Sequence, residues 1–302
     1  LASHGRPGPV HIEIPLDVLQ ASLKAESECG ETSDERPAAT QESSPLVSTG
    51  PEPLRRAAEL LRSSKRVAFI CGGGAVRASS EVRELQQRVG AATVTTSAGK
   101  GLLPENSPLS LGCRLHFTPV KKFLESMDIV CAIGTQLSPT DLWEGEPEIE
   151  NKLIILNTEQ KVLQRYPRAL LHLHADAGEA VRRIVRELSV TTASSGRHDQ
   201  AGSGGAAAQS LAEEVRTALS ACQDEVLQVT GIPSKSAGQI LSLLQVLRSA
   251  LPDDGVFVTD MTTPAYAALS EWPVQAPAQF LHPVGFGALG YALPTAIGIK
   301  SS

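Results

Sequence analysis

The sequence predicts an α/β protein built on a parallel β-sheet with helices on both faces. The main observation is an alternation across residues 53–188, where short apolar, β-branched runs of strand length are separated by helical patterns. Two stretches rich in small and polar residues, 23–52 and 189–208, frame this region and contain few large apolar side chains. Such segments bury too little apolar surface to offset the cost of ordering, so we expect linkers or loose loops there.

The elements of the alternating region follow from periodicity and boundary residues. Helices are expected at 54–62, 79–90, 117–127 and 177–188, and strands at 66–71, 92–96, 128–134, 151–157 and 170–176. The second helix starts with two serines and closes on Gly90, residues typical of helix boundaries. Gly72, Gly73 and Gly74 follow the first strand and are expected to form a turn.

The last part of the chain is also expected to alternate. Helices are predicted at 209–222, 235–252, 262–272 and 289–300, with strands at 255–261 and 279–284. The hexapeptide GFGALG, residues 285–290, precedes the final helix. Its G-x-G-x-x-G spacing occurs in dinucleotide-binding sites and also in many tight turns. The pattern alone therefore leaves a dinucleotide site, another kind of ligand site and a structural turn open.

Composition and charge exclude several classes of protein. The net charge of −6, with no local cluster of Lys or Arg, argues against nucleic-acid binding. The longest apolar runs, such as Val67–Cys71 and Leu153–Leu156, are far too short to span a membrane. The five cysteines are scattered without a C-x-x-C pair, and His172 and His174 lack a third ligand, so neither zinc nor disulfides are expected. We expect a small-molecule partner, no nucleic acid or membrane, and a cytoplasmic location.

Four stretches carry a resemblance to a known family. They are GRPGPVHIEIPLDV (5–18), GKGLLPENSPLSLG (99–112), VFVTDMTT (256–263) and GFGALGYALPTAIGIK (285–300). In order and spacing they resemble the thiamine diphosphate-dependent 2-oxo acid decarboxylases and acetohydroxyacid synthases. Within that family, TDMTTPAYAA, FLHPVGFGALGYALP and GTQLSPTDLWEG (134–145) look most like 5-guanidino-2-oxopentanoate decarboxylases. The resemblance implies that GFGALG is a thiamine motif.

The resemblance also implies a division of the chain into domains. The expected parts are the end of a pyrimidine-binding domain (1–22), a linker (23–52), a Rossmann-like central α/β domain (53–188), a linker and helix (189–233) and the truncated start of a diphosphate-binding α/β domain (234–302). The chain begins without Met and shows no targeting segment. By the resemblance, the metal motif of the family would follow Ser302 and its catalytic glutamate would precede residue 1, so we expect an internal fragment that is inactive alone.

Cofactors and assembly are implied in the same way. Thiamine diphosphate and Mg²⁺ are expected, with the metal ligands and the glutamate that protonates the pyrimidine lying outside this chain. FAD, which the central domain of the acetohydroxyacid synthase branch holds, is not expected, because no flavin contacts are evident around Gly72, Gly73 and Gly74. The whole protein is expected to be a homodimer or homotetramer, because family active sites form between subunits.

Candidate site residues follow from the resemblance. Leu289 is expected to be the apolar wedge under the bent cofactor, and the carbonyl of Gly287 to accept from its 4′-amino group, with Ala288 in the same cofactor-binding stretch. Thr262 and Thr263 lie at a strand-to-helix junction, where hydroxyls and N–H groups favour anions. The residues alone leave alternatives open: a core leucine, a glycine turn, and a pair of helix-capping threonines.

His282 precedes the glycine run on the expected substrate side, where it could assist protonation near neutral pH; a structural histidine is the alternative. Asp260 is expected to form the turn after its strand. The function expected is non-oxidative decarboxylation of a 2-oxo acid, with 5-guanidino-2-oxopentanoate as the candidate substrate. A carboligase of the acetohydroxyacid synthase type, a non-catalytic scaffold, and an NAD- or flavin-dependent oxidoreductase are the alternatives.

Overall fold

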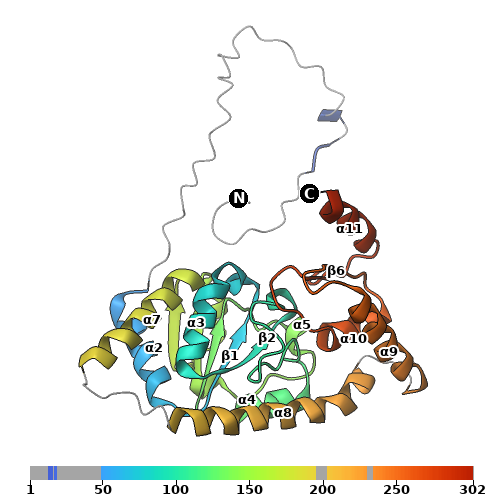
Figure 1. Ribbon diagram of the computed structural model, residues 1–302. Helices are drawn as coiled ribbons and strands as arrows, with labels where there is room; N and C mark the ends of the chain where they lie inside the picture. The colour runs from blue at the N-terminus through green and yellow to red at the C-terminus, as the bar shows by residue number, and fades with distance from the viewer. Residues whose placement is uncertain (1–12, 16, 19–48, 195–202, 230–233, 302) are drawn as a thin grey trace.

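The structure is a computed structural model that describes residues 13–15, 17–18, 49–194, 203–229 and 234–301. Most of the expected pyrimidine-domain end and of the first linker therefore lies outside the described residues. Figure 1 shows a large α/β body with a smaller C-terminal unit beside it. None of the described helices is long and apolar enough to cross a membrane.

The body is built on a five-stranded parallel sheet in the order β2-β1-β3-β4-β5. Its strands are β1 (Val67–Cys71), β2 (Ala92–Thr95), β3 (Ile129–Ile133), β4 (Leu153–Asn157) and β5 (Leu171–His174). The first four are buried along their whole length. Burial of this kind is typical of a parallel sheet with helices on both faces. The predicted α/β class is confirmed.

Helices cover both faces of this sheet. One face carries α2 (Pro51–Ser63), α3 (Ser79–Val89) and α7 (Ala177–Ser194), and the other carries α4 (Thr118–Glu125), α5 (Pro139–Leu142), α6 (Gln160–Gln164) and α8 (Ser203–Val229). Successive β1 residues alternate between the two cores: Phe69 packs with the first set of helices and Ile70 with the second. This alternation follows from the two-residue repeat of a strand.

The segment expected to be a loose loop, 189–208, is helical where the structure describes it. Helix α7 continues to Ser194, and α8 begins at Ser203. The alanines at 206–208 favour helix, and Leu211 and Val215 of α8 are buried against the second face of the sheet. A run that looks featureless in composition is therefore the start of a helix that completes the central core.

The glycine turn after β1 also differs in detail from the expectation, since a 3₁₀ helix, Gly73–Ala78, begins within it. A Cβ atom at Gly72 would lie 2.4 Å from the carbonyl oxygen of Gly134, which follows β3. The amide of Gly74 donates to the same oxygen at 2.9 Å. Glycine is therefore required here by the close approach of two strand-end turns.

The cysteines of the described residues are buried and free; they are Cys71, Cys113, Cys131 and Cys222. Burial raises the pKa of the Cys131 and Cys222 thiols to about 12. They therefore pack as small apolar side chains. Cys29 lies outside the described part of the chain.

The C-terminal unit joins α9 (Ser234–Ala250), α10 (Thr263–Glu271) and α11 (Ala292–Ser301) to a parallel pair, β6 (Phe257–Val258) and β7 (Phe280–Leu281). Figure 1 shows it in orange and red at one side of the large sheet. Trp272 is fully buried at its centre and stacks on Phe257 with ring centroids 4.0 Å apart. The two strands are shorter than the sequence predicts, because pairing stops after two residues on each.

A buried ion pair joins the central body to this unit. The ammonium of Lys100 donates to Glu105 Oε1 at 3.0 Å, to Oε2 at 2.8 Å and to the carbonyl of Leu269 at 3.0 Å. Glu105 in turn accepts from the amide of Val274 at 3.1 Å and donates its own amide to the Val274 carbonyl at 3.0 Å. The exposed fractions of the Lys100 and Glu105 side chains are 1% and 5%. Every ammonium proton therefore has an acceptor, and the loop after β2 is fixed to the segment that follows α10.

We expect Lys100→Met to lower the free energy of unfolding by about 3–5 kcal/mol, because it leaves the Glu105 carboxylate buried without its cation. Urea denaturation measures the loss. Arg88→Met, which removes an exposed i,i+4 partner of Glu84, is the matched control and should change stability by about 0–1 kcal/mol. Adding Glu105→Leu to Lys100→Met should restore much of the loss, and a double variant as unstable as the single one would contradict this role of the pair.

Candidate functional site

A cavity of about 1010 Å³ lies between the large sheet and the C-terminal unit. The carboxyl ends of all five strands open into it, through residues at or just after each strand: Gly73, Thr95, Gly134, Asn157 and Ala175. The C-terminal unit supplies the facing wall, with Met261, His282 and Gly287 among its residues. In open parallel sheets ligands bind at this edge, next to the reversal of strand order, which here falls between β1 and β3.

The hexapeptide 285–290 connects β7 to α11 along this wall. Gly285, Gly287 and Gly290 have φ values of +94°, +73° and +82°. A Cβ atom would strain the backbone at such angles, so the G-x-G-x-x-G spacing reflects three left-handed positions. Asp260 accepts from the amide of Gly290 at 2.8 Å and from that of Met261 at 3.0 Å. Asp260 therefore forms the turn after β6, as predicted, and also ties it to the turn after β7.

The predicted site residues fall into two groups at the carboxyl ends of β6 and β7. Gly287 and His282 line the cavity. The others lie on the outer surface: Thr262, Thr263, Ala288 and Leu289. Leu289 is 80% exposed, so it belongs to no hydrophobic core of the described residues.

Thr262 is the N-cap residue of α10, and Thr263 is the first residue of the helix. The Thr262 hydroxyl makes no capping hydrogen bond, and both side chains are exposed. A helix N-terminus carries partial positive charge and backbone N–H groups that lack helical acceptors. The junction between β6 and α10 is therefore chemically suited to an anion such as a phosphate.

His282 is held by the end of β6. Its Nδ1 atom lies 2.8 Å from the hydroxyl of Thr259. Burial lowers the pKa of His282, and the carboxylate of Asp260 opposes that shift. The ring is therefore neutral at neutral pH, and it is a weaker base than free histidine toward a proton donor in the cavity.

The two histidines of β5 are structural. The Nε2–H groups of His172 and His174 donate to the carbonyls of Tyr166 and Thr158 at 2.8 and 3.0 Å. Across the described ranges, no group of three His, Cys, Asp or Glu side chains is placed to hold a metal ion.

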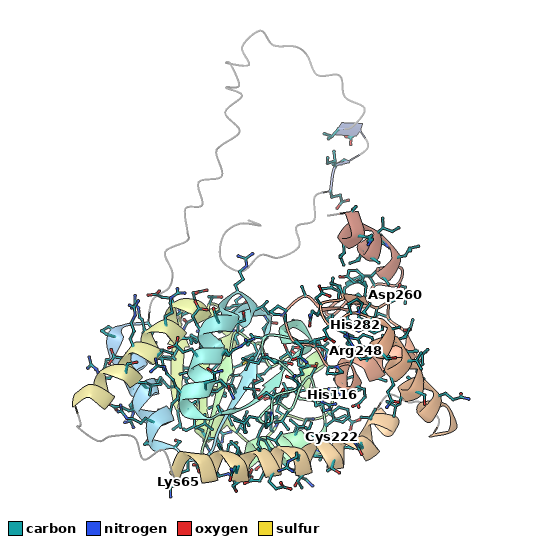
Figure 2. The ribbon with its side chains drawn as sticks, in the orientation of Figure 1. Lys65, His116, Cys222, Arg248, Asp260 and His282 are labelled. Atoms are coloured by element: carbon teal, nitrogen blue, oxygen red, sulfur yellow. The ribbon has the colours of Figure 1, made fainter. Side chains whose placement is uncertain are left out.

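Sequence reasoning missed the residues of the central domain that face the C-terminal unit. His116 stacks on Trp143 with ring centroids 4.3 Å apart, and Asp141 accepts from the Ser138 hydroxyl at 2.7 Å. Most of these residues belong to the loop 134–145. Its resemblance to one branch of the family was the only feature of the sequence that indicated a functional role. His116 and His282, both labelled in Figure 2, belong to the two different walls of the cavity.

Thr95, at the end of β2, carries a polar atom without a partner. Its hydroxyl is buried at the cavity wall and makes no hydrogen bond within the described parts of the chain. An unsatisfied buried hydroxyl is unfavourable, so a water molecule or a ligand that bonds to Thr95 would be stabilised there.

We expect the protein to lose stability between pH 6.5 and about 4 through His116. Burial lowers the pKa of His116 from 6.5 to about 4, and the nearby Lys121 and Arg114 cations act in the same direction. Between these values the unfolded chain binds a proton that the folded one does not, so stability present above pH 6.5 is lost as the pH falls. His116→Phe keeps a ring against Trp143 and should lose less over this range, by up to about 3 kcal/mol. Urea denaturation at pH 7 and 4.5 measures the difference; equal losses would contradict a neutral, buried His116.

Comparison with known proteins identifies the fold. Residues 54–184 match the family described as "Thiamine pyrophosphate enzyme, central domain". The chain is 33% identical over 295 residues to the "Probable 2-ketoarginine decarboxylase AruI" of Pseudomonas aeruginosa, covering 98% of this chain and 48% of the relative. It is 25% identical over 304 residues to the "Acetolactate synthase isozyme 1 large subunit" of Escherichia coli, covering 99% and 48%. The chain thus spans about half the length of the curated relatives it matches. Residues 54–184, which hold the five-stranded parallel sheet, are thus similar to the central domain of thiamine pyrophosphate enzymes.

Proposed function

We propose that the whole protein catalyses the thiamine diphosphate-dependent, non-oxidative decarboxylation of a 2-oxo acid, with 5-guanidino-2-oxopentanoate as its substrate. The observation that carries the proposal is the left-handed glycine run that Asp260 ties to the start of α10, beside the large cavity. The 33% identity to a protein named as a 2-ketoarginine decarboxylase supports the choice of substrate. Mg²⁺, a homo-oligomeric assembly and a cytoplasmic location belong to the same proposal. The expectation that the central domain holds no FAD stays a prediction.

The side chains and backbone around the glycine run fit this cofactor. The exposed hydroxyls of Thr262 and Thr263 at the N-terminus of α10 suit the diphosphate. Gly287 adopts a backbone angle that presents its peptide group without a shielding Cβ atom. The apolar side chain of Leu289 is exposed to solvent, so it is available to pack as a wedge between two rings.

Thiamine diphosphate, when bound, supplies a nucleophilic carbon and an electron sink for the 2-oxo acid. The residues of this chain would bind and orient the cofactor and the 2-oxo acid. The carbonyl of Gly287 would accept a hydrogen bond from the amino group of the cofactor, and the side chain of Leu289 would pack against its rings. Nδ1 of His282 is hydrogen-bonded to Thr259, so Nε2 is the nitrogen that would exchange a proton with a substrate in the cavity.

The surface around the glycine run supports an assembly between subunits. Large apolar side chains are exposed there and along α11: Phe286 at 95%, Leu289 at 80%, Leu293 at 71% and Ile297 at 61%. The described α11 has no buried residue. A group of exposed apolar side chains of this size is typical of a protein–protein interface. A second subunit that covers it would also enclose the wedge residue.

Two measurements on the complete protein test the proposed function. Calorimetric titration with thiamine diphosphate should show binding that requires Mg²⁺, and no binding with the metal present would contradict the cofactor. Release of CO₂ from 5-guanidino-2-oxopentanoate, with the corresponding aldehyde as product, should follow. A carbon–carbon bonded product would instead favour a carboligase, the second candidate, which the identity to an acetolactate synthase supports.

We expect Leu289→Ala in the complete enzyme to lower kcat at least about tenfold, because a loss of about 1.4 kcal/mol of transition-state positioning has this effect. Cofactor affinity should fall less, because the anion site at Thr262 and Thr263 is unchanged. Leu289→Met, which keeps length and apolarity, should retain most activity. Leu170→Ala, at an exposed leucine of the central body that does not line the cavity, is the matched control, and steady-state kinetics with cofactor titration supply the comparison. An unchanged kcat for Leu289→Ala would exclude the wedge role.

A further inference from the structure

The one carboxylate among the described side chains that line the cavity, that of Asp141, has no Lys or Arg beside it in the lining. Burial lowers the pKa of both lining histidines, His116 to about 4, so neither adds positive charge at neutral pH. Burial also raises the pKa of the Cys113 thiol to about 11. A lone carboxylate in such a space favours a cationic ligand.

The indole ring of Trp143 lies two residues along the chain from the carboxylate of Asp141. His116 stacks on Trp143 at an interplanar angle of 20°, and the indole N–H donates to the carbonyl of Thr140 at 2.9 Å. Trp143 nevertheless stays 38% exposed and lines the cavity. A ring fixed from one side and exposed on another can take a planar cation against its surface, and guanidinium is the side-chain cation best suited to such stacking.

The loop is built to hold these two side chains. Leu137 and Trp143 have φ values of +47° and +56°, which are unfavourable for residues other than glycine. The buried ammonium of Lys121 donates to the carbonyls of Leu142 and Glu144 and so anchors the loop from the side of the core. Strain of this kind persists where the surrounding contacts enforce it, often at ligand sites.

The Asp141 carboxylate is only partly engaged. Ser138 donates to Oδ2 at 2.7 Å, and Oδ1 has no partner within the described part of the chain. Lys121 does not line the cavity, and its donors are directed to backbone carbonyls of the loop. A carboxylate oxygen is therefore available for the forked N–H donors of a guanidinium.

We propose that Asp141 and Trp143 form the subsite that binds the guanidinium of the substrate and so determine specificity for a cationic 2-oxo acid. The inference rests on the proposed decarboxylase function and deepens it by assigning the residues that recognise the end of the substrate remote from the reaction. The opposite wall of the same cavity carries Gly287 and His282, the two predicted site residues that line it.

The first test measures binding without turnover in the complete holoenzyme. The probes are 5-guanidinopentanoate and its neutral isostere 5-ureidopentanoate, neither of which has an oxo group to react. Calorimetry should show the guanidino probe binding at least about tenfold more tightly, the effect expected for one charge-assisted hydrogen-bonded pair. Asp141→Asn, which can still accept from Ser138, should abolish this preference. Glu144→Gln, which removes an exposed carboxylate of the same loop that does not line the cavity, should retain it.

The second test measures turnover with 5-guanidino-2-oxopentanoate and 5-ureido-2-oxopentanoate. Asp141→Asn should lower kcat/KM at least about tenfold for the guanidino acid and no more than about twofold for the ureido acid. Trp143→Leu should also lower kcat/KM more for the guanidino acid than for the ureido acid. This variant replaces Asp141→Asn in the test if Asp141→Asn fails to fold.

The outcomes separate the two claims. If the wild type releases no CO₂ from either acid, the decarboxylase function fails, and the binding test still decides the subsite. Equal weakening of both probes by Asp141→Asn, or no change for either, would overturn the subsite. Loss of the preference for the guanidino probe alone would support it.

Discussion

The buried pair of Lys100 and Glu105 is the interaction on which the rest of the structure depends. Among the ion pairs of the described residues, it is the one whose two side chains are both almost fully buried. It fixes the segment after α10 to the loop after β2. The start of α10 carries the proposed anion site, so a charged contact in the interior sets where the cofactor would lie relative to the large sheet. A pair that is fully hydrogen-bonded can hold such a position, whereas removal of either partner leaves a charge without compensation.

Both sheets present the carboxyl ends of their strands to one cavity, and this shared direction explains how two units form one site. The large sheet contributes its strand-end turns and the loop 134–145, and the small pair contributes the turn tied by Asp260 and the glycine run. Loops at such an edge are free to vary while the strands beneath them stay fixed. In the proposed enzyme the C-terminal wall orients the cofactor, and the loop from the central domain selects the substrate.

Much of this architecture is predictable from the sequence, for identifiable reasons. Strands β1 and β3 are continuous apolar runs, and α3 is bounded by serines and by Gly90 in a left-handed conformation. The glycine run is also predictable, because the spacing of its glycines matches the three positions where the backbone needs them. Each of these signals is local.

The features that were missed depend on contacts distant in the chain or on backbone angles without a sequence signal. Lys100 finds its acceptor at Leu269, far along the chain, and no pattern around either residue indicates that pairing. Trp143 adopts a left-handed angle without glycine, so its place on the cavity wall could not be predicted. The start of α8 looks like a linker in composition, but it leads into a helix that buries Leu211 and Val215 against the sheet.

Hydrogen exchange at two backbone amides tests most directly whether the two units are docked as one body around a fixed cavity. The amide of Glu105 donates to the Val274 carbonyl, and that of Val274 donates to the Glu105 carboxylate. If the docking is permanent, both amides should exchange as slowly as those of β1 and β3, through global unfolding alone. Rapid exchange at Glu105 and Val274, while β1 and β3 stay protected, would show that the C-terminal unit detaches and would contradict a preformed site.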